Sequence, residues 1–298
     1  MSSTVLEPAS AEAPASSKPI TTVGIVGGGF MGAGIAESAA LAGIDVVLRE
    51  LPEFLDGTRR RFESSLERAV KRGKRDGADR DAAVARTTLT SDLQDLAGAE
   101  LVIEAVPENA ELKTTIMKAL GGIVADDAVI ASNTSSIPIA QLAGAVHNSD
   151  RVVGLHFFSP VPVMNLVEIV RALDTSDVTI ETAHTFVTQL GKQAIETKDR
   201  SGFVVNFLLI PYLMAAVRMY EEDFASREDI DEGMKLGAGH PMGPLALCDF
   251  IGLDVLHAVC NSLYEEFKRD EYAPPPLMKR MIAAGRLGRK SGRGFYEY

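Results

Sequence analysis

The fold of this chain is decided by the stretch TTVGIVGGGFMGAGIAESAALA, residues 21–42. An apolar run leads into a glycine-rich turn, and small and apolar residues follow it. This order predicts a strand, a Gly-x-Gly-x-x-Gly turn and a helix. In such a unit Gly27 allows the tight turn, Gly29 lets a pyrophosphate approach the backbone, and Gly32 lets the helix pack close to the strand. The N-terminus of the helix then faces the phosphates.

A second apolar segment strengthens the prediction of a dinucleotide site. Ile44 to Leu48 reads as a strand, and Glu50 follows it, eighteen residues after Gly32. A carboxylate at that distance is expected to bind the adenosine ribose, and it favours NAD over NADP because it would repel a 2′-phosphate. The neighbouring Arg49 leaves the strictness of that preference open. We expect NAD to be contacted by the turn and this acid, namely Gly27, Gly29, Phe30, Met31, Gly32 and Glu50.

Length and composition narrow the class of protein. The chain has 298 residues, enough for two domains, and 46% hydrophobic with 24% charged residues is a globular composition. The net charge of −11 argues against nucleic acid or an anionic membrane as a general partner. Cys248 and Cys260 have no motif spacing and are expected to be reduced, buried thiols of a cytoplasmic protein. Neither the histidines nor the cysteines have metal-ligand spacing, so no metal site is expected.

Two further segments bear on location. Residues 1–18 are rich in Ala, Ser, Pro and Glu and carry acids where a signal peptide needs basic residues, so a disordered tail is expected there. The longest apolar run, Val204 to Val217, is shorter than a membrane span and is interrupted by Pro211. We interpret it as a buried helix, and we expect no membrane insertion.

Later segments predict a parallel sheet with polar groups at one edge. Leu101 to Val106 and Ala128 to Ser132 are almost continuously apolar, as strands buried on both faces are. Ligands of a doubly wound sheet bind beyond the carboxyl ends of its strands. Glu108, Ser135 and His156 each fall at or just after such an end, so the three are expected to converge.

The pattern changes near residue 200. We predict that strands end after Gly191 and that everything beyond 199–202 is helical. The predicted helices are 203–222, 227–236, 252–269 and 276–284, with a Gly/Pro loop at 237–244. The expected architecture is α/β: a Rossmann-like doubly wound sheet domain followed by an all-α C-terminal domain. The expected bounds are a tail at 1–18, a NAD-binding domain at 19–201 and a helical substrate and dimerisation domain at 202–298.

A histidine and a glutamate form a candidate catalytic pair. His156 ends the apolar strand 151–155, and Glu168 lies within the next strand, 165–170, so the two can meet across the connecting loop. An imidazole held by a buried carboxylate suits a general base near neutral pH. The alternative is a core histidine beside a strand-edge acid, and taken alone such a pair is more often structural.

Basic residues gather on the helix expected at 52–72. One face carries Arg61, Ser65, Arg68 and Arg72, and further cations lie nearby at Arg59, Arg60, Lys71, Lys74 and Arg75. A solvated helix face is the usual role of such a run. The functional alternative is a clamp for a phosphorylated ligand, such as the 3′-phosphate ADP of coenzyme A. The residues alone do not separate the two.

Several blocks together resemble the L-3-hydroxyacyl-CoA dehydrogenase family, and within it most the bacterial 3-hydroxybutyryl-CoA dehydrogenases. The resemblance covers the chain from about residue 20 to its C-terminus. Its blocks are GGGFMGAGIA (27–36), EAVPEN (104–109), SNTSS (132–136), HFFSPVPVM (156–164), GFVVN (202–206), PMGPL (241–245) and LGRKSGRGFY (287–296). Two positions depart from the family: Glu50 replaces the more usual Asp, and Ser159 stands where Asn is more frequent.

The resemblance implies a function and a set of roles. The chain would oxidise a short-chain L-3-hydroxyacyl-CoA with NAD, with His156 as base and Glu168 as its partner. Ser135 and Asn206 would bind the substrate near the reacting oxygen, with Ser135 also near the cofactor. Glu108 and Lys113 would lie near the nicotinamide and its ribose. The coenzyme A clamp would consist of Ser65, Arg68 and Arg72.

The resemblance also implies a homodimer formed through the helical domain.

Two alternative functions stay open. One is a dehydrogenase of the same fold acting on a 3-hydroxyacyl group held by an acyl carrier protein, or on a free hydroxy acid. The other is a non-enzymatic, crystallin-like relative.

Overall fold

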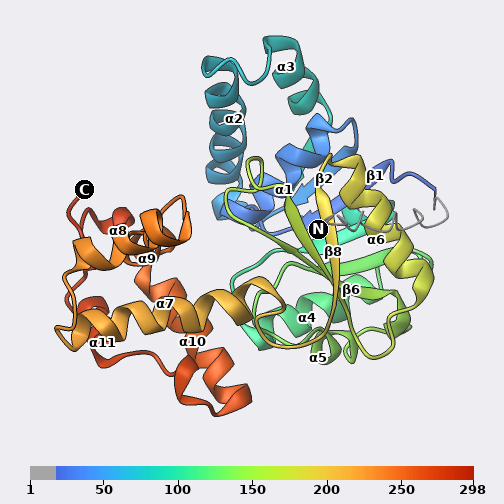
Figure 1. Ribbon diagram of the computed structural model, residues 1–298. Helices are drawn as coiled ribbons and strands as arrows, with labels where there is room; N and C mark the ends of the chain where they lie inside the picture. The colour runs from blue at the N-terminus through green and yellow to red at the C-terminus, as the bar shows by residue number, and fades with distance from the viewer. Residues whose placement is uncertain (1–17) are drawn as a thin grey trace, which may run out of the picture. The chain divides into compact units, whose positions relative to one another are not determined.

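The computed structural model describes residues 18–298, which form two compact units (Figure 1). The first comprises the described residues up to Asn133 together with Leu142–Glu196, and the second comprises Thr134–Gln141 and Thr197–Tyr298. The second unit thus includes a short segment, 134–141, that lies within the predicted NAD-binding domain. The tail predicted at 1–18 lies, apart from Lys18, outside the described residues.

The first unit is built on one eight-stranded sheet in the order β3-β2-β1-β4-β5-β6-β7-β8. The strands are β1 (Thr22–Val26), β2 (Asp45–Arg49), β3 (Thr87–Thr90), β4 (Leu101–Glu104), β5 (Val129–Ser132), β6 (Val152–Phe157), β7 (Leu166–Arg171) and β8 (Gln193–Lys198). Strands β1 to β6 pair in parallel, and β7 runs antiparallel to β6. The predicted Rossmann-like α/β fold is confirmed.

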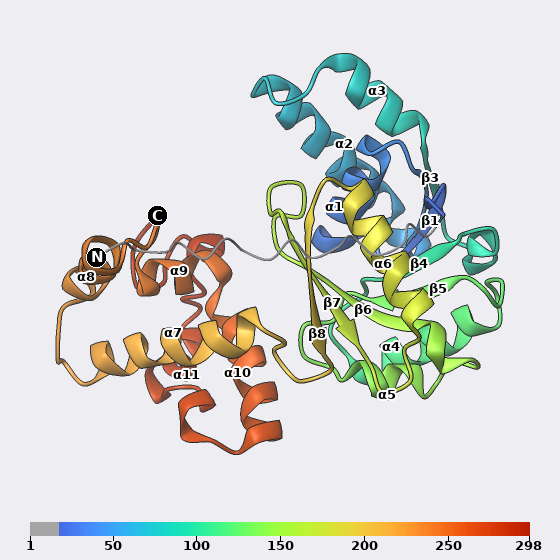
Figure 2. The ribbon, with the colours of Figure 1, turned by 45° about the vertical axis from the view of Figure 1, so that its right-hand side comes forward.

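Helices cover both faces of this sheet. The helices along this part of the chain are α1 (Phe30–Leu41), α2 (Leu55–Lys71), α3 (Gly77–Ala85), α4 (Ala110–Gly121), α5 (Ile139–Ala143), which begins in the second unit, and α6 (Asp177–Gln189). Ile35 of α1 and Phe186 of α6 share one buried cluster with Ile25 and Ile103 of the central strands. Helix α4 packs on β4 and β5 outside that cluster, and Figure 2 shows it on the side of the sheet opposite α6.

One prediction about the sheet was wrong, because strands do not end after Gly191. Strand β8 follows at the sheet edge beside β7. Four of the six residues in its sequence, Gln-Ala-Ile-Glu-Thr-Lys, are polar, and no residue of it is buried. An edge strand exposed in this way carries too little apolar signal to be distinguished from a loop.

The second unit is helical, as predicted. Its helices are α7 (Val205–Glu221), α8 (Arg227–Ala238), α9 (Pro244–Ile251), α10 (Leu253–Phe267) and α11 (Pro276–Ala283). They pack around one buried cluster that includes Leu213, Leu245 and Leu256. The prediction missed α9, which begins where a Gly/Pro loop was expected to end. Pro244 occupies the first turn of α9, where a missing N–H costs no helical hydrogen bond.

Helix α7 corresponds to the apolar run at 204–217 and continues through Pro211. It is buried along one side only, since Leu208 is 66% exposed. Within residues 18–298 no single helix has the length and apolar character needed to cross a membrane. Helices α9 and α10 would reach that length only together, and they meet at a bend of 97°. Cys248 and Cys260 are free and buried, as predicted.

Candidate active site

The glycine-rich turn after β1 has the geometry of a phosphate-binding turn. Gly27 has φ = 102°, and a Cβ there would lie 2.7 Å from the carbonyl oxygen of Ala105. A Cβ on Gly32 would lie 1.8 Å from the carbonyl oxygen of Gly27, so only glycine lets α1 start this close to the turn. Gly29 faces open space, and no side chain caps α1. The unpaired N–H groups at the start of α1 are therefore suited to binding a pyrophosphate.

Glu50 lies beside this turn. Its Oε2 accepts a hydrogen bond from the Gly28 N–H at 2.8 Å, and its Oε1 accepts one from the Leu51 N–H at 2.7 Å. These bonds fix the carboxylate and leave it further acceptor sites, because a carboxylate offers about four lone pairs. The Nε of Arg49 donates to the carbonyl oxygen of Ser91 at 3.3 Å. The arrangement fits the ribose of a bound NAD.

A buried ion-pair network lies where β4 ends. The Nζ of Lys113 lies 2.7 Å from Glu104 Oε1, 3.1 Å from the Val106 carbonyl oxygen and 3.3 Å from Glu108 Oε2. These three acceptors match the three N–H groups of the amine. The other oxygen of Glu104 accepts from the Ser132 hydroxyl at 2.6 Å. Sequence reasoning placed Glu108 and Lys113 near the nicotinamide but missed Glu104. The Nζ of Lys113 lies between the carboxylates of Glu104 and Glu108.

His156 and Glu168 meet as expected. They are directly opposite each other in the antiparallel ladder of β6 and β7, and Nδ1 lies 2.6 Å from Glu168 Oε2. Glu168 is fully buried and His156 is 6% exposed. Beside an ionised carboxylate, which can only accept a hydrogen bond, Nδ1 would carry the hydrogen and the basic lone pair of the neutral ring would be on Nε2. The ring of Phe158 packs against the imidazole with centroids 4.6 Å apart.

Ser135 and Asn206 belong to the second unit. Ser135 lies in the segment 134–141, and Asn206 in the first turn of α7. The segment is attached within its own unit by Asp199, which accepts from the N–H groups of Ile139 and Ala140 at 3.0 and 2.7 Å. The two residues expected to bind substrate thus come from one unit and the histidine pair from the other.

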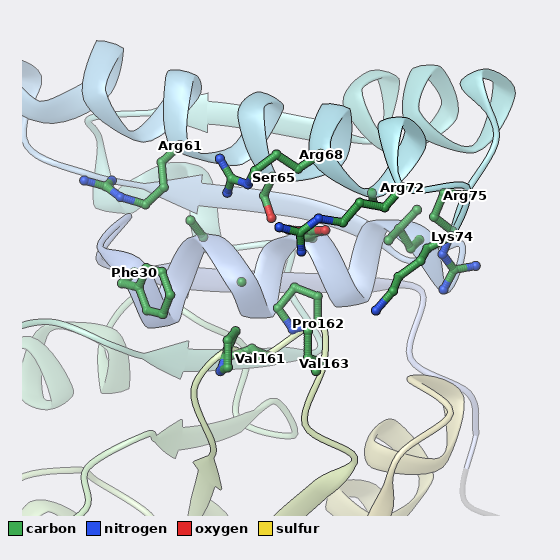
Figure 3. Close-up of a pocket in the computed structure, with 16 residues that line it drawn as sticks. Phe30, Arg61, Ser65, Arg68, Arg72, Lys74, Arg75, Val161, Pro162 and Val163 are labelled. Atoms are coloured by element: carbon green, nitrogen blue, oxygen red, sulfur yellow. The ribbon is translucent and has the colours of Figure 1, made fainter. Parts of the chain in front are cut away.

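Some of the basic residues of α2 and of the turn that follows it line a pocket of about 610 Å³ in the first unit. Figure 3 shows Ser65 pointing from α2 toward α1, and Arg72 reaching back along α2 toward it. The pocket brings Ser65, Arg68 and Arg72 together, and its lining also includes Lys74, Arg75, Glu37 and the loop Pro160–Val163. Arg61 lies at the same pocket, and its guanidinium donates to the Gly28 carbonyl oxygen at 2.7 Å.

Sequence reasoning missed Glu37 and the loop at this pocket. One signal was available for Glu37, which is the only charged residue of α1. The loop joins β6 to β7, so it connects the strands of His156 and Glu168. Lys192 fixes it by donating to the carbonyl oxygens of Val161 and Met164 at 2.7 and 2.8 Å. The loop packs closely on α1, since a Cβ on Gly34 would lie 2.9 Å from the Cβ of Val161.

Over residues 18–298, His, Cys, Asp and Glu side chains do not gather in any group of three or more that would hold a metal ion.

Comparison with known proteins identifies the family of both units. Residues 22–200 match the family described as 3-hydroxyacyl-CoA dehydrogenase, NAD binding domain, and residues 202–298 match its C-terminal domain. A 3-hydroxybutyryl-CoA dehydrogenase of Mycobacterium tuberculosis is 52% identical over 95% of this chain and 100% of its own length. The mitochondrial hydroxyacyl-coenzyme A dehydrogenase of Sus scrofa is 42% identical over 97% of this chain and 95% of its own.

Solved structures agree with these matches. The crystal structure of FadB2 from M. tuberculosis has a TM-score of 0.93 at 51% identity, covering 94% of this chain and 100% of that one. That of (S)-3-hydroxybutyryl-CoA dehydrogenase from Ralstonia eutropha has a TM-score of 0.89 at 48% identity, covering 94% and 99%. With both family domains matched in order, and with the glycine-rich turn and the histidine–glutamate pair in place, the chain belongs to the 3-hydroxyacyl-CoA dehydrogenases and is an NAD-dependent enzyme of that family.

Proposed function

We propose that this enzyme interconverts L-3-hydroxybutyryl-CoA and acetoacetyl-CoA, with His156 as the general base. The observation that carries the proposal is the 2.6 Å contact between His156 Nδ1 and the buried carboxylate of Glu168. The short acyl chain is supported by the relatives, which include several 3-hydroxybutyryl-CoA dehydrogenases.

The residues around the glycine-rich turn fit NAD. The uncapped start of α1 would bind the pyrophosphate, and Glu50 the adenosine ribose. When bound, NAD accepts the hydride from C3 of the substrate. Glu108, held by Lys113, would border the nicotinamide ribose.

The histidine moves the proton. In the oxidative direction Nε2 of His156 takes the proton of the 3-hydroxyl, and Glu168 stabilises the imidazolium that forms. In the reductive direction the same nitrogen returns the proton to the 3-oxo group. General acid–base help of this kind contributes roughly 10²–10⁴-fold in rate. Ser135 and Asn206 would orient the hydroxyl and the thioester carbonyl, which is positioning work.

The basic pocket supports coenzyme A as the carrier. Arg68, Arg72 and Arg75 converge on a pocket large enough for a phosphorylated nucleotide, and planar guanidinium groups suit phosphate oxygens. A free hydroxy acid would make no use of these cations. Acyl carrier protein remains the alternative carrier, because its acyl group is also attached through phosphopantetheine.

A substrate panel tests the proposal. Purified enzyme with NADH should reduce acetoacetyl-CoA, and it should do so faster than it reduces acetoacetyl carrier protein or free acetoacetate. NADPH should support the reaction poorly. If the carrier-protein substrate is reduced and the CoA ester is not, the alternative carrier is correct. No turnover of any of these substrates, by correctly folded protein, would contradict the proposed substrate.

Charge reversal tests the pocket. Arg68→Glu with Arg72→Glu should raise KM for acetoacetyl-CoA by about tenfold or more, because charge-assisted contacts contribute roughly 1.5–3 kcal/mol each. Arg60→Glu with Lys71→Glu is the matched control, since both cations are exposed on α2 and do not line the pocket. An unchanged KM in the first double variant would rule out the clamp.

We also propose a homodimer formed through the second unit. An apolar groove of about 590 Å³ on this unit is lined by α7, residues 240–242 and α9, and it includes the exposed Leu208 and the half-exposed Phe250. Leu208→Glu should convert the dimer to a monomer in light scattering. Leu173→Glu is the control, because Leu173 is 90% exposed on the first unit. A monomeric wild-type enzyme would contradict the proposal.

For location, we propose the cytoplasm, supported by the two free cysteines. Cell fractionation with antibody detection tests this, and recovery in the membrane or secreted fraction would contradict it.

A further inference from the structure

Glu37 is a buried acid in the lining of the basic pocket. It lies in the middle of α1, where all other residues are uncharged, and it is 2% exposed. A carboxylate removed from water is unfavourable unless it is paired. Its presence among arginines that face a phosphate site therefore needs a physical account.

The partners of Glu37 are the same side chains that would bind phosphate. The Ser65 hydroxyl donates a hydrogen bond to it, and the charges of Arg68 and Arg75 attract it. The opposite wall, Pro160–Val163, carries no titratable side chain. The charged groups facing Glu37 thus come from α2 and the turn that follows it. A phosphate entering the pocket must share Arg68 and Arg75 with this carboxylate.

Burial outweighs these favourable contacts. Desolvation raises the pKa of Glu37 above the ordinary value for glutamate, and the hydrogen bond from Ser65 and the two arginines lower it only in part. A phosphate dianion brought beside the carboxylate would raise that pKa further, because a like charge disfavours ionisation. At pH values near the raised pKa of Glu37, phosphate binding is thereby coupled to proton uptake from solvent.

We propose that Glu37 sets the affinity of the pocket for the 3′-phosphate of coenzyme A by competing with it for Arg68 and Arg75. While ionised, Glu37 attracts these two arginines from within the same pocket lining, and when protonated it leaves their charge to the phosphate. The inference rests on the proposed role of this pocket as the coenzyme A clamp. Glu37 is then a specificity-determining residue that acts on the carrier end of the substrate and not on the reacting carbon.

The direction of the pH effect follows from these charges. Lowering the pH through the raised pKa of Glu37 neutralises the competitor, which favours phosphate binding. The phosphate itself loses its second charge near pH 6, which opposes binding. Glu37→Gln separates the two effects, because the amide is neutral at every pH while the phosphate titrates as before. The glutamine oxygen can still accept the hydrogen bond from Ser65.

Calorimetric titration of CoA into wild-type enzyme and Glu37→Gln, from pH 8 to pH 5, tests the inference. At pH 8 the variant should bind CoA about tenfold more tightly, the effect of one unit of pKa coupling. The difference should narrow as the pH falls. Titrations in buffers of different ionisation enthalpy should show proton uptake for the wild type that the variant lacks. Dephospho-CoA, which lacks only the 3′-phosphate, should bind both proteins equally.

The controls separate this inference from the pocket assignment. If Arg72→Glu weakens CoA but not dephospho-CoA, the pocket is the phosphate site. An equal or weaker affinity of Glu37→Gln at pH 8 then overturns the role of Glu37 alone. If Arg72→Glu and removal of the 3′-phosphate both have no effect, the clamp itself fails and the inference fails with it. Should Glu37→Gln not fold, Ser65→Ala serves instead: losing its hydrogen bond should move the proton uptake to higher pH, and an unchanged pH profile overturns the inference.

Discussion

His156 and Glu168 face each other across the β6–β7 ladder, with Nδ1 2.6 Å from Oε2. Their backbones are fixed by an antiparallel register that also pairs Phe157 with Val167. The geometry of the pair is therefore set by the sheet, while the loop between the strands is free to serve the neighbouring pocket.

Removing the imidazole should abolish turnover without removing the cofactor. His156→Ala should lower kcat by about 10²–10⁴-fold, because the proton then leaves to water. Glu168→Gln should cause a smaller loss, since the amide can orient the ring but cannot stabilise an imidazolium. NADH oxidation with acetoacetyl-CoA measures both rates, and NADH fluorescence checks binding.

His184→Ala is the control for this pair, because His184 is a partly exposed residue of α6 on the surface of the first unit. If His156→Ala kept a wild-type kcat, another group would be the base.

Replacing the acid that follows β2, Glu50, should weaken the preference for NAD. Glu50→Gln keeps an acceptor for the Gly28 N–H but removes the charge that would repel a 2′-phosphate. The ratio of kcat/KM for NADH to that for NADPH should fall by about tenfold, which corresponds to 1.4 kcal/mol. Glu53→Gln, exposed just before α2, should leave the ratio unchanged. A ratio that Glu50→Gln does not alter would place the discrimination elsewhere.

A methyl group on Gly34 should disturb the loop that lines the pocket. Its Cβ would lie 2.9 Å from the Cβ of Val161, so Gly34→Ala must displace the loop. Overpacking of this kind costs about 1–3 kcal/mol, and KM for the CoA ester should rise with it. Urea denaturation and steady-state kinetics measure the two effects.

Gly57→Ala provides a control of opposite sign. Gly57 lies in α2 with no atom within 4 Å of an added Cβ, so alanine there should stabilise the helix by about 0.5–1 kcal/mol. Equal stability changes in the two variants would contradict the close packing of Gly34 on Val161.

The two cysteines should be inert in the folded enzyme. Burial raises the pKa of Cys260 to about 12 and the pKa of Cys248 well above its ordinary value. The thiolate is the reactive form, and at pH 8 it would amount to roughly one part in 10⁴ for Cys260. A disulfide reagent such as dithiobis(nitrobenzoate) should titrate no thiol before denaturation and two after it. Rapid reaction of native protein would show that one of these helices opens readily.

The sequence predicted those parts of the fold that carry strong local patterns. The glycine-rich turn and the acid after β2 were recognised by their fixed spacing, and the strands β4 and β5 by their apolar, fully buried runs. Strand β8 was missed because a half-exposed edge strand has no apolar run. Helix α9 was missed because Pro244 reads as a breaker, although at the first turn of a helix it is favourable.

The candidate site divides in the same way. His156 and Glu168 could be paired from sequence, because consecutive strands with a short connection are expected to be neighbours. The ion pair between Lys113 and Glu104 could be found only from the structure, because the two residues lie in different predicted segments. Glu37 required the structure as well. Its partners lie on α2 and in the turn that follows it, and nothing in the sequence gives the rotation of α1 against that helix.

The loop between β6 and β7 limits how this enzyme can be redesigned. Side chains alternate between the two faces of a strand, so an insertion that shifts the pairing by one residue would turn either His156 or Glu168 to the opposite side of the sheet. The same insertion would change one wall of the basic pocket, because Pro160–Val163 lines that wall. Altering the pocket while keeping the histidine–glutamate pair in place therefore requires substitutions that preserve the length of this loop.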